Sequence, residues 1–184
     1  PDTLVQADVP PAATFDSDEA PMYEGVDRLM IVFVDGKFDE AASDDLSLEG
    51  VTIERLSEAA KSDIHWAKDV YGVLEERGQT PVERPLAALN TALAEDGLLI
   101  HVTGKVSKPI NLIYHHRSEV SDAILHHAIK LDEGADLTVL ENGPAAARFN
   151  KVMEVDVADG AGFHHVRTQG RDHERRGATH IFAR

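Results

Sequence analysis

The sequence contains no cysteine. A chain without thiols cannot form a disulfide, a thiolate zinc site or a cysteine nucleophile, so these three kinds of chemistry are excluded within it. It also lacks any apolar run close to the roughly 20 residues that a membrane-spanning helix needs. Its first residues, PDTLVQADVPPAATF, have neither the basic start nor the apolar core of a secretory signal. We therefore expect a soluble, cytoplasmic protein.

Basic side chains are scarce. There are 18 Lys and Arg residues against 33 Asp and Glu, which gives a formal net charge of −15. Such a chain repels phosphate backbones, so nucleic acid is excluded as a general partner. Arginine gathers only near the end, in RDHERRG, which we interpret as a solvated loop. With 184 residues, 42% of them hydrophobic, the chain can form a packed core.

The first half of the chain divides into two predicted segments. Residues 1–27, rich in proline and acids, predict an acidic linker or an extended tail. Residues 28–95 predict a hairpin plus helices. In DRLMIVFVDGKF an apolar run ends at Asp35-Gly36, a dipeptide typical of a tight hairpin turn. The stretch LSEAAKSDIHWAKDVYGVLEERG is helical in pattern, and we interpret its aromatic residues as core.

A further helix is predicted where Pro85 opens PLAALNTALAEDG. Its apolar residues fall on one side of the helix. These residues are Leu86, Leu89, Ala92 and Leu93.

Residues 96–184 change to a period of two, as in strands, with glycine or proline between the runs. No long helical pattern intervenes, so a sandwich, a barrel or a β-solenoid remains. A repeat favours the solenoid, because KLDEGADLTVLE and DVADGAGFHHVR align at an offset of 26 residues. We therefore predict the first rungs of a β-helix, with Leu137 stacked on Phe163. Extending this frame back to VTGKVSKPINL requires an insertion or deletion.

The ten histidines invite a metal-site interpretation, since adjacent pairs occur at 115–116, 126–127 and 164–165. Neighbours in a strand point to opposite faces, so a pair cannot chelate a metal from one strand. His165 aligns with Val139 in the repeat, and we expect it to be a hydrogen-bonded interior residue. Glu133 and Asp159 align as exposed acids at a turn. No phosphate-binding GxxxxGK[ST] loop occurs, so we expect no ATP hydrolysis.

The order of several stretches resembles the SufB/SufD family of iron–sulfur cluster assembly proteins, and within it the SufD branch more closely. The stretches are VFVDGKF, PLAALNTALAEDGLLIHV, KPINLIY, KLDEGADLTVLE and VADGAGFHHVRTQ. The resemblance runs from about Arg28 to the end. It implies a mainly β fold, with a right-handed parallel β-helix preceded by a small α+β segment. It further implies a non-enzymatic scaffold subunit that works beside a SufB-like subunit and a SufC-like ATPase, with an iron–sulfur cluster in the full complex.

Two parts of the family have no counterpart here, the helices that open it and its C-terminal half. The missing half includes a segment of the form KPxLEIxxDDVxCxHG and a helical region that binds the ATPase. We therefore expect a fragment that binds the ATPase poorly and self-associates through an uncovered last rung. No catalytic, cofactor-binding or metal-binding residue is assigned, and we expect no cofactor in this chain.

A second hypothesis is a histidine-rich all-β metal-binding enzyme of the cupin sort. Such a barrel would place a His-x-His motif and a glutamate on its inward faces, and the histidines here are adjacent pairs instead. A third, a β-helical enzyme acting on polysaccharides, would need aromatic platforms for sugars, whereas aromatic residues make up 5% of the chain.

Overall fold

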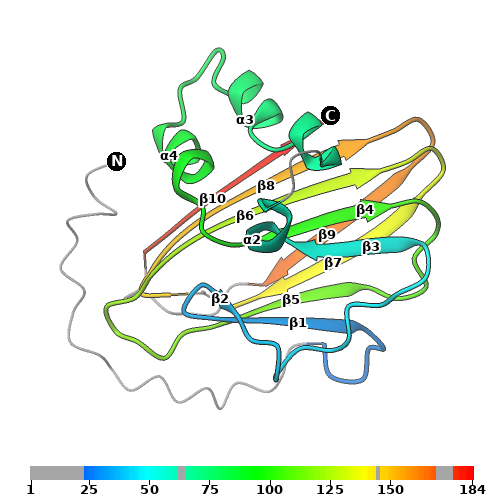
Figure 1. Cartoon of the computed structure of the whole chain (residues 1–184), viewed down its shortest axis with the longest axis horizontal. Coiled ribbons are helices and arrows are strands. Elements are labelled where there is room, and N and C mark those ends of the chain that lie inside the picture. Colours follow the sequence, from blue (N-terminus) through cyan, green and yellow to red (C-terminus); the bar gives the residue numbers. More distant parts are fainter. Residues whose placement is uncertain (1–22, 62–64, 144–145, 169–175) are drawn as a thin grey trace.

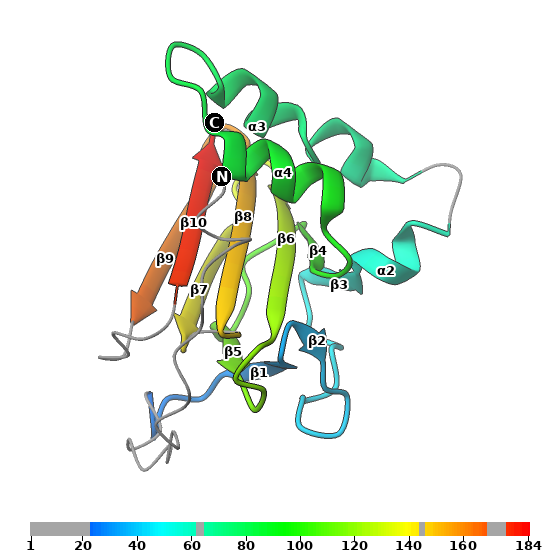
Figure 2. The ribbon, with the colours of Figure 1, turned by 90° about the vertical axis from the view of Figure 1, so that its left-hand side faces the viewer.

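The computed structural model describes residues 23–61, 65–143, 146–168 and 176–184. They form two mixed β-sheets packed face to face, with short helices against the outer face of one sheet (Figure 1, Figure 2). The predicted mainly β fold is confirmed. Most of the predicted tail, residues 1–22, and most of the arginine-rich stretch, residues 171–175, lie outside the described residues.

Both sheets have five strands, and from β4 onward consecutive strands alternate between them. Two pairs, β1–β2 and β3–β4, are antiparallel, and the other paired strands in the described residues are parallel. Sheet A has the order β2 (Lys37–Phe38), β1 (Leu29–Val34), β5 (Ile110–His115), β7 (Asp136–Asn142), β9 (Gly162–Thr168). Sheet B has the order β10 (Arg176–Ala183), β8 (Arg148–Val157), β6 (Asp122–Leu131), β4 (Leu98–Val102), β3 (Val51–Arg55).

The 26-residue repeat is the register of two parallel strand pairs, β7 with β9 and β6 with β8. Leu137 on β7 pairs in parallel with Phe163 on β9, as predicted. The turns before these strands also stack, since the Gly162 N–H donates to the Ala135 carbonyl at 2.8 Å. One step earlier, Ile110 pairs with Val139, a spacing of 29 residues. The predicted insertion or deletion therefore lies between these two steps.

The predicted hairpin is present. Asp35 (φ 49°) and Gly36 (φ 78°) connect β1 to β2 in the left-handed conformation that such turns need. A side chain at Gly36 would also collide, because its Cβ would lie 2.5 Å from the Cβ of Ala123. The sequence did not predict that β1 also pairs in parallel with β5, which begins at Ile110.

In the residues that the structure describes, the helical stretch that follows contains three short pieces. They are α2 (Leu56–Ala59), the 3₁₀ helix η1 (Trp66–Asp69) and α3 (Val73–Gly78). Gly72, with φ 75°, is left-handed and separates the last two. Strand β3, just before α2, was not predicted.

Helix α4 (Pro85–Leu93) begins at the predicted proline, but its fully buried residues are not those of the apolar side. Leu93 is 52% exposed, whereas Ala87 and Asn90 are fully buried. The small Ala87 lets the helix approach sheet B closely. The Asn90 amide then donates to the carbonyls of Leu125 and Asn150, on β6 and β8, at 3.0 and 2.9 Å. Hydrogen bonds to the strands, rather than apolar burial alone, set the rotation of this helix.

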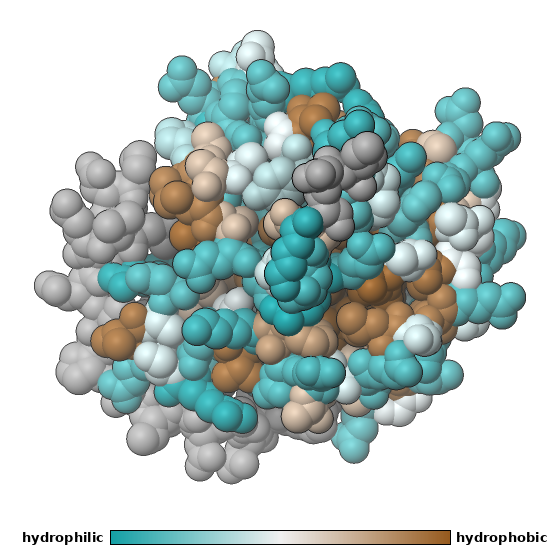
Figure 3. Space-filling view, viewed as in Figure 1, coloured by the Kyte–Doolittle hydropathy of each residue, from teal (hydrophilic) through white to brown (hydrophobic). Residues whose placement is uncertain are grey.

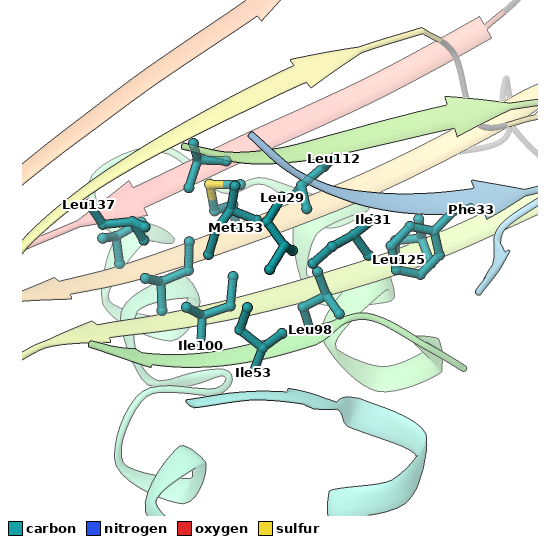
Figure 4. Packing of buried hydrophobic residues seen from close by; sticks show 14 of the residues in the cluster. Leu29, Ile31, Phe33, Ile53, Leu98, Ile100, Leu112, Leu125, Leu137 and Met153 are labelled. Carbon is teal, nitrogen blue, oxygen red and sulfur yellow. The ribbon is translucent and has the colours of Figure 1, made fainter. Parts of the chain in front are cut away.

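The main core lies between the two sheets. Figure 4 shows apolar side chains of both sheets pointing toward one another, among them Leu29, Leu112 and Leu137 from sheet A and Ile100 and Met153 from sheet B. A smaller cluster lies on the outer face of sheet B, under the helical pieces. Among the described residues, no helix is long and apolar enough to cross a membrane.

Candidate functional site

A group of polar side chains interrupts the apolar core between the sheets. Each comes from a different strand, and each takes an inward position that alternates with outward residues. On β7, for example, Leu137, Val139 and Glu141 alternate along the strand and are all fully buried. The group consists of Tyr114 on β5, His127 on β6, Glu141 on β7, Lys151 on β8 and His165 on β9.

Glu141 is the centre of this interior network. Both of its carboxylate oxygens accept hydrogen bonds from the Lys151 ammonium, and both side chains have no exposed surface. Oε1 also accepts from the Tyr114 hydroxyl at 2.7 Å, and Oε2 bonds His165 Nε2 at 2.7 Å. The pair joins sheet A to sheet B, because Glu141 lies on β7 and Lys151 on β8.

The charges of the network follow from these contacts. Burial alone would raise the pKa of Glu141, but the His165 hydrogen bond and the Lys151 charge outweigh it and hold that pKa well below its usual range. Burial lowers the pKa of Lys151 to about 8 although Glu141 opposes the shift. Burial and the nearby Glu141 charge raise the pKa of Tyr114 well above its ordinary value. At neutral pH the centre is therefore an ion pair bonded to a neutral phenol.

His127 is held neutral in one tautomer. Its Nδ1 accepts from the Leu98 backbone N–H at 3.1 Å, so the proton is on Nε2, which lies 3.0 Å from the Tyr114 hydroxyl. Burial, followed by the charge of Lys151, lowers the pKa of His127 to about 3. A chain of hydrogen bonds thus runs from His127 through Tyr114 to Glu141.

A second buried carboxylate lies on the opposite face of sheet B. Glu154 on β8 accepts from the backbone N–H groups of Leu74 and Glu75, each at 2.8 Å, and from that of Gly72. It also bonds His126 Nε2 at 2.7 Å, and both side chains are fully buried. Glu154 therefore fastens the start of α3 to the sheet.

The histidine pairs behave as the strand geometry predicts. His126 points outward to Glu154 and His127 inward to Tyr114, so the two do not share a face. His165 pairs with Val139 and is hydrogen-bonded, as expected, whereas His164 is exposed. Among the described residues, no group of three or more His, Asp or Glu side chains could hold a metal ion.

The other side chains considered from the sequence take structural places. Glu133 and Asp159 are exposed at stacked turns, where the Gly134 N–H lies 3.3 Å from the Asp159 carbonyl. Trp66 packs against the smaller cluster on sheet B, and Tyr71 stacks on His126 with ring centroids 4.1 Å apart. The aromatic residues of this stretch thus belong to the packing, as interpreted.

Sequence reasoning missed the centre of the network. A usable signal was present, since Glu141 follows Leu137 and Val139 at inward spacing, and Lys151 stands between Phe149 and Met153 in the same way. A charge at an inward position of a strand needs a buried partner of opposite sign. The arrangement that results is closed on itself, because the side chains that bond Glu141 come from β5 and β9 of its own sheet and from β8 of the other.

Comparison with known proteins identifies the chain's relatives. No curated protein sequence matches it significantly. A family model described as the SufBD protein N-terminal region matches residues 6–112, more than half of the chain. The chain therefore belongs to the SufB/SufD family.

Proposed function

We propose that the chain is a non-enzymatic scaffold subunit of a SufBCD-type complex for iron–sulfur cluster assembly, and that it belongs to the SufD branch. The match to the SufBD N-terminal region carries this proposal. The closed polar network agrees with it, because Glu141 is bonded by Lys151, Tyr114 and His165 and offers no oriented group to a substrate. A cytoplasmic location and the absence of a cofactor in this chain are part of the proposal.

The same proposal covers the architecture. Residues 96–184 form the first rungs of a right-handed parallel β-helix, residues 28–95 a small α+β segment before it, and residues 1–27 an acidic tail. Two observations support the β-helix: the strands alternate between the sheets, and one parallel step in each sheet is 26 residues, from Leu137 to Phe163 and from Asp122 to Arg148. A solenoid of this kind is stiff along its axis, which suits a subunit that holds partners in place.

The proposed partners are a SufB-like scaffold subunit and a SufC-like ATPase. The cluster would be a property of the assembled complex rather than of this chain, since protein-bound clusters are held chiefly by thiolates and the sequence has none. A cupin-like metal enzyme is the weaker alternative, because it would need several inward ligands around one point. The interior histidines His127 and His165 are instead engaged by Tyr114 and Glu141.

Anaerobic reconstitution of the purified chain with iron and sulfide tests this proposal, read by visible absorption and by iron and sulfide analysis. We expect no stoichiometric cluster and less than a tenth of an equivalent of any transition metal. A stoichiometric cluster would overturn the role proposed for this chain. One tightly bound metal ion per chain, lost in His127→Gln or His165→Gln, would favour the metal enzyme.

A further inference from the structure

Strand β3 presents a free edge at one end of sheet B. It is the last strand of that sheet in the described residues and pairs with β4, while the preceding loop forms one antiparallel bridge, from Leu48 to Val51. The backbone bonds from Thr103 to Gly50 and from Leu56 to Gly97 fix which residues face β4. By the alternation of an antiparallel ladder, Ile53 then turns its N–H and C=O away from β4. These groups form a short template for another strand.

A shallow groove of about 540 Å³ runs along this edge. Its apolar lining comes from the loop before β3 and from the strand itself, and Figure 3 shows apolar side chains gathered on this part of the surface. The lining residues are Leu46, Leu48, Val51 and Ile53, with Glu49 and Thr52 beside them. An extended segment laid along the edge would place every second side chain in this groove.

The rim of the groove is acidic. Residues 39–54 contain six Asp and Glu residues and no Lys or Arg. Asp45 and Glu49, which flank Leu46 and Leu48, are exposed to solvent. Glu54, on the strand, is not part of this rim, because it alternates with Ile53 and bonds His65 Nε2 at 2.8 Å. The edge therefore combines the outward backbone groups of Ile53, an apolar groove and negative charge beside it.

We propose that this edge binds an extended basic segment of a partner protein as an added β-strand. Alternate apolar side chains of the segment fill the groove, and its Lys or Arg side chains face the acidic rim. Backbone hydrogen bonds to β3 supply affinity, while the groove and the rim supply selectivity.

The charge argues for a partner of opposite sign rather than for a second copy of this chain. The chain carries a net charge of −15, so two copies meeting at an acidic edge would repel one another. Acidic side chains beside a free edge also act against pairing between like edges. The same charges attract a basic strand, and salt should weaken that attraction.

The test uses residues 1–184 and a synthetic peptide of eight residues that alternates Val with Lys or Arg. Titration by fluorescence anisotropy should give saturable binding that weakens with added salt. Two peptide controls separate the contributions. One replaces each Lys or Arg of the peptide by glutamate. The other carries an N-methylated central valine, whose backbone cannot donate a hydrogen bond to the strand edge. We expect each change to weaken binding at least tenfold.

A pair of charge variants locates the site. The double substitution Asp45→Lys with Glu49→Lys should weaken binding of the basic peptide at least tenfold. The matched control, Glu133→Lys with Asp159→Lys, makes the same charge change at the exposed turns and should leave binding within twofold. Peptide binding should also slow hydrogen exchange at the Ile53 amide.

Three outcomes would overturn the proposal. They are no binding at millimolar peptide, equal loss of binding in both charge variants, and full binding of the N-methylated peptide. Sedimentation that shows a dimer abolished by Asp45→Lys with Glu49→Lys, without peptide binding, would assign the edge to a second copy instead. None of these results depends on iron–sulfur chemistry, so the scaffold proposal is tested separately.

Discussion

Glu141 on one sheet and Lys151 on the other form an ion pair that has no exposed side-chain surface. A buried pair of this kind adds little net stability over apolar residues, but removing one partner leaves an uncompensated charge. The pair can also specify which strands face each other, because a shift by one residue would turn Glu141 to the outer face of its sheet. We infer that the ion pair fixes how sheet A packs on sheet B.

A double-mutant cycle tests this relationship. We expect Glu141→Gln and Lys151→Met each to lower the free energy of unfolding by about 3–5 kcal/mol. The double variant should lose less than the sum of the two by at least about 1 kcal/mol, because neither residue then leaves a buried charge. Urea unfolding followed by circular dichroism measures all four proteins. Strict additivity would show that the pair is not coupled.

Glu154 gives a prediction for the opposite face of sheet B. Glu154→Gln removes a carboxylate that accepts from Leu74 and Glu75, so we expect a loss of about 2–4 kcal/mol. In this variant, hydrogen exchange at the Leu74 and Glu75 amides should become faster by a larger factor than exchange at the amides of the β-strands. The matched control is Glu58→Gln, since Glu58 is exposed and pairs with Lys61. It should leave the free energy of unfolding nearly unchanged. Equal effects of the two substitutions would contradict the fastening role.

The lowered pKa of His127 leads to a prediction for how the free energy of unfolding depends on pH. In the native protein its pKa is about 3, against 6.5 for the free group, so the unfolded chain binds a proton first as the pH falls. Stability should therefore decrease from about pH 6.5 toward pH 3, by on the order of 4 kcal/mol from this residue. The pKa of Glu141 is also lowered in the native protein, so its carboxyl group takes up a proton more readily in the unfolded chain. Acid therefore lowers the free energy of unfolding through Glu141 as well.

The variant His127→Gln isolates that contribution. Glutamine can still accept from the Leu98 N–H and donate to the Tyr114 hydroxyl, but it does not titrate. Urea unfolding at intervals between pH 7 and pH 4.5 should show a shallower loss of stability than in the unmodified chain. Parallel curves for the two proteins would mean that His127 is not the group responsible.

Leu137 tests the stacking of the repeat. It is fully buried and pairs with Phe163, so Leu137→Ala should cost about 2–5 kcal/mol by leaving a cavity. Leu93→Ala is the matched control, because Leu93 is 52% exposed on α4. It should cost less than about 1 kcal/mol. Thermal or urea unfolding compares the two, and a Leu93→Ala loss as large as that of Leu137→Ala would contradict the assigned core.

Features written in local sequence were predictable. The Asp35-Gly36 turn and the 26-residue register follow from backbone conformation and from period-two burial, which neighbouring residues determine. The pairing of β1 with β5 was not predictable in this way. It joins Leu29 to Ile110 across a long stretch of chain, and no local pattern encodes the partner.

Polar partners explain the remaining differences. Apolar periodicity does not reveal the buried face of α4, because Asn90 turns inward to bond strand carbonyls of other segments. The alternating positions of Glu141 and Lys151 indicate that both charges are buried. They do not indicate that these two residues form an ion pair with each other. The sequence therefore predicted the type of fold better than the side-chain contacts that hold the two sheets and the helices together.

Affinity capture with a SufB-like subunit and a SufC-like ATPase tests the central claim, that the chain works by assembly rather than catalysis. Two chains are compared at equal concentration and moderate salt: residues 1–184, and a longer chain that adds the family's C-terminal helical region. The account predicts that the longer chain retains both partners, while residues 1–184 retain little or no ATPase. Equal ATPase capture by both would place the binding surface within residues 1–184, and capture of neither partner by either chain would contradict the scaffold function.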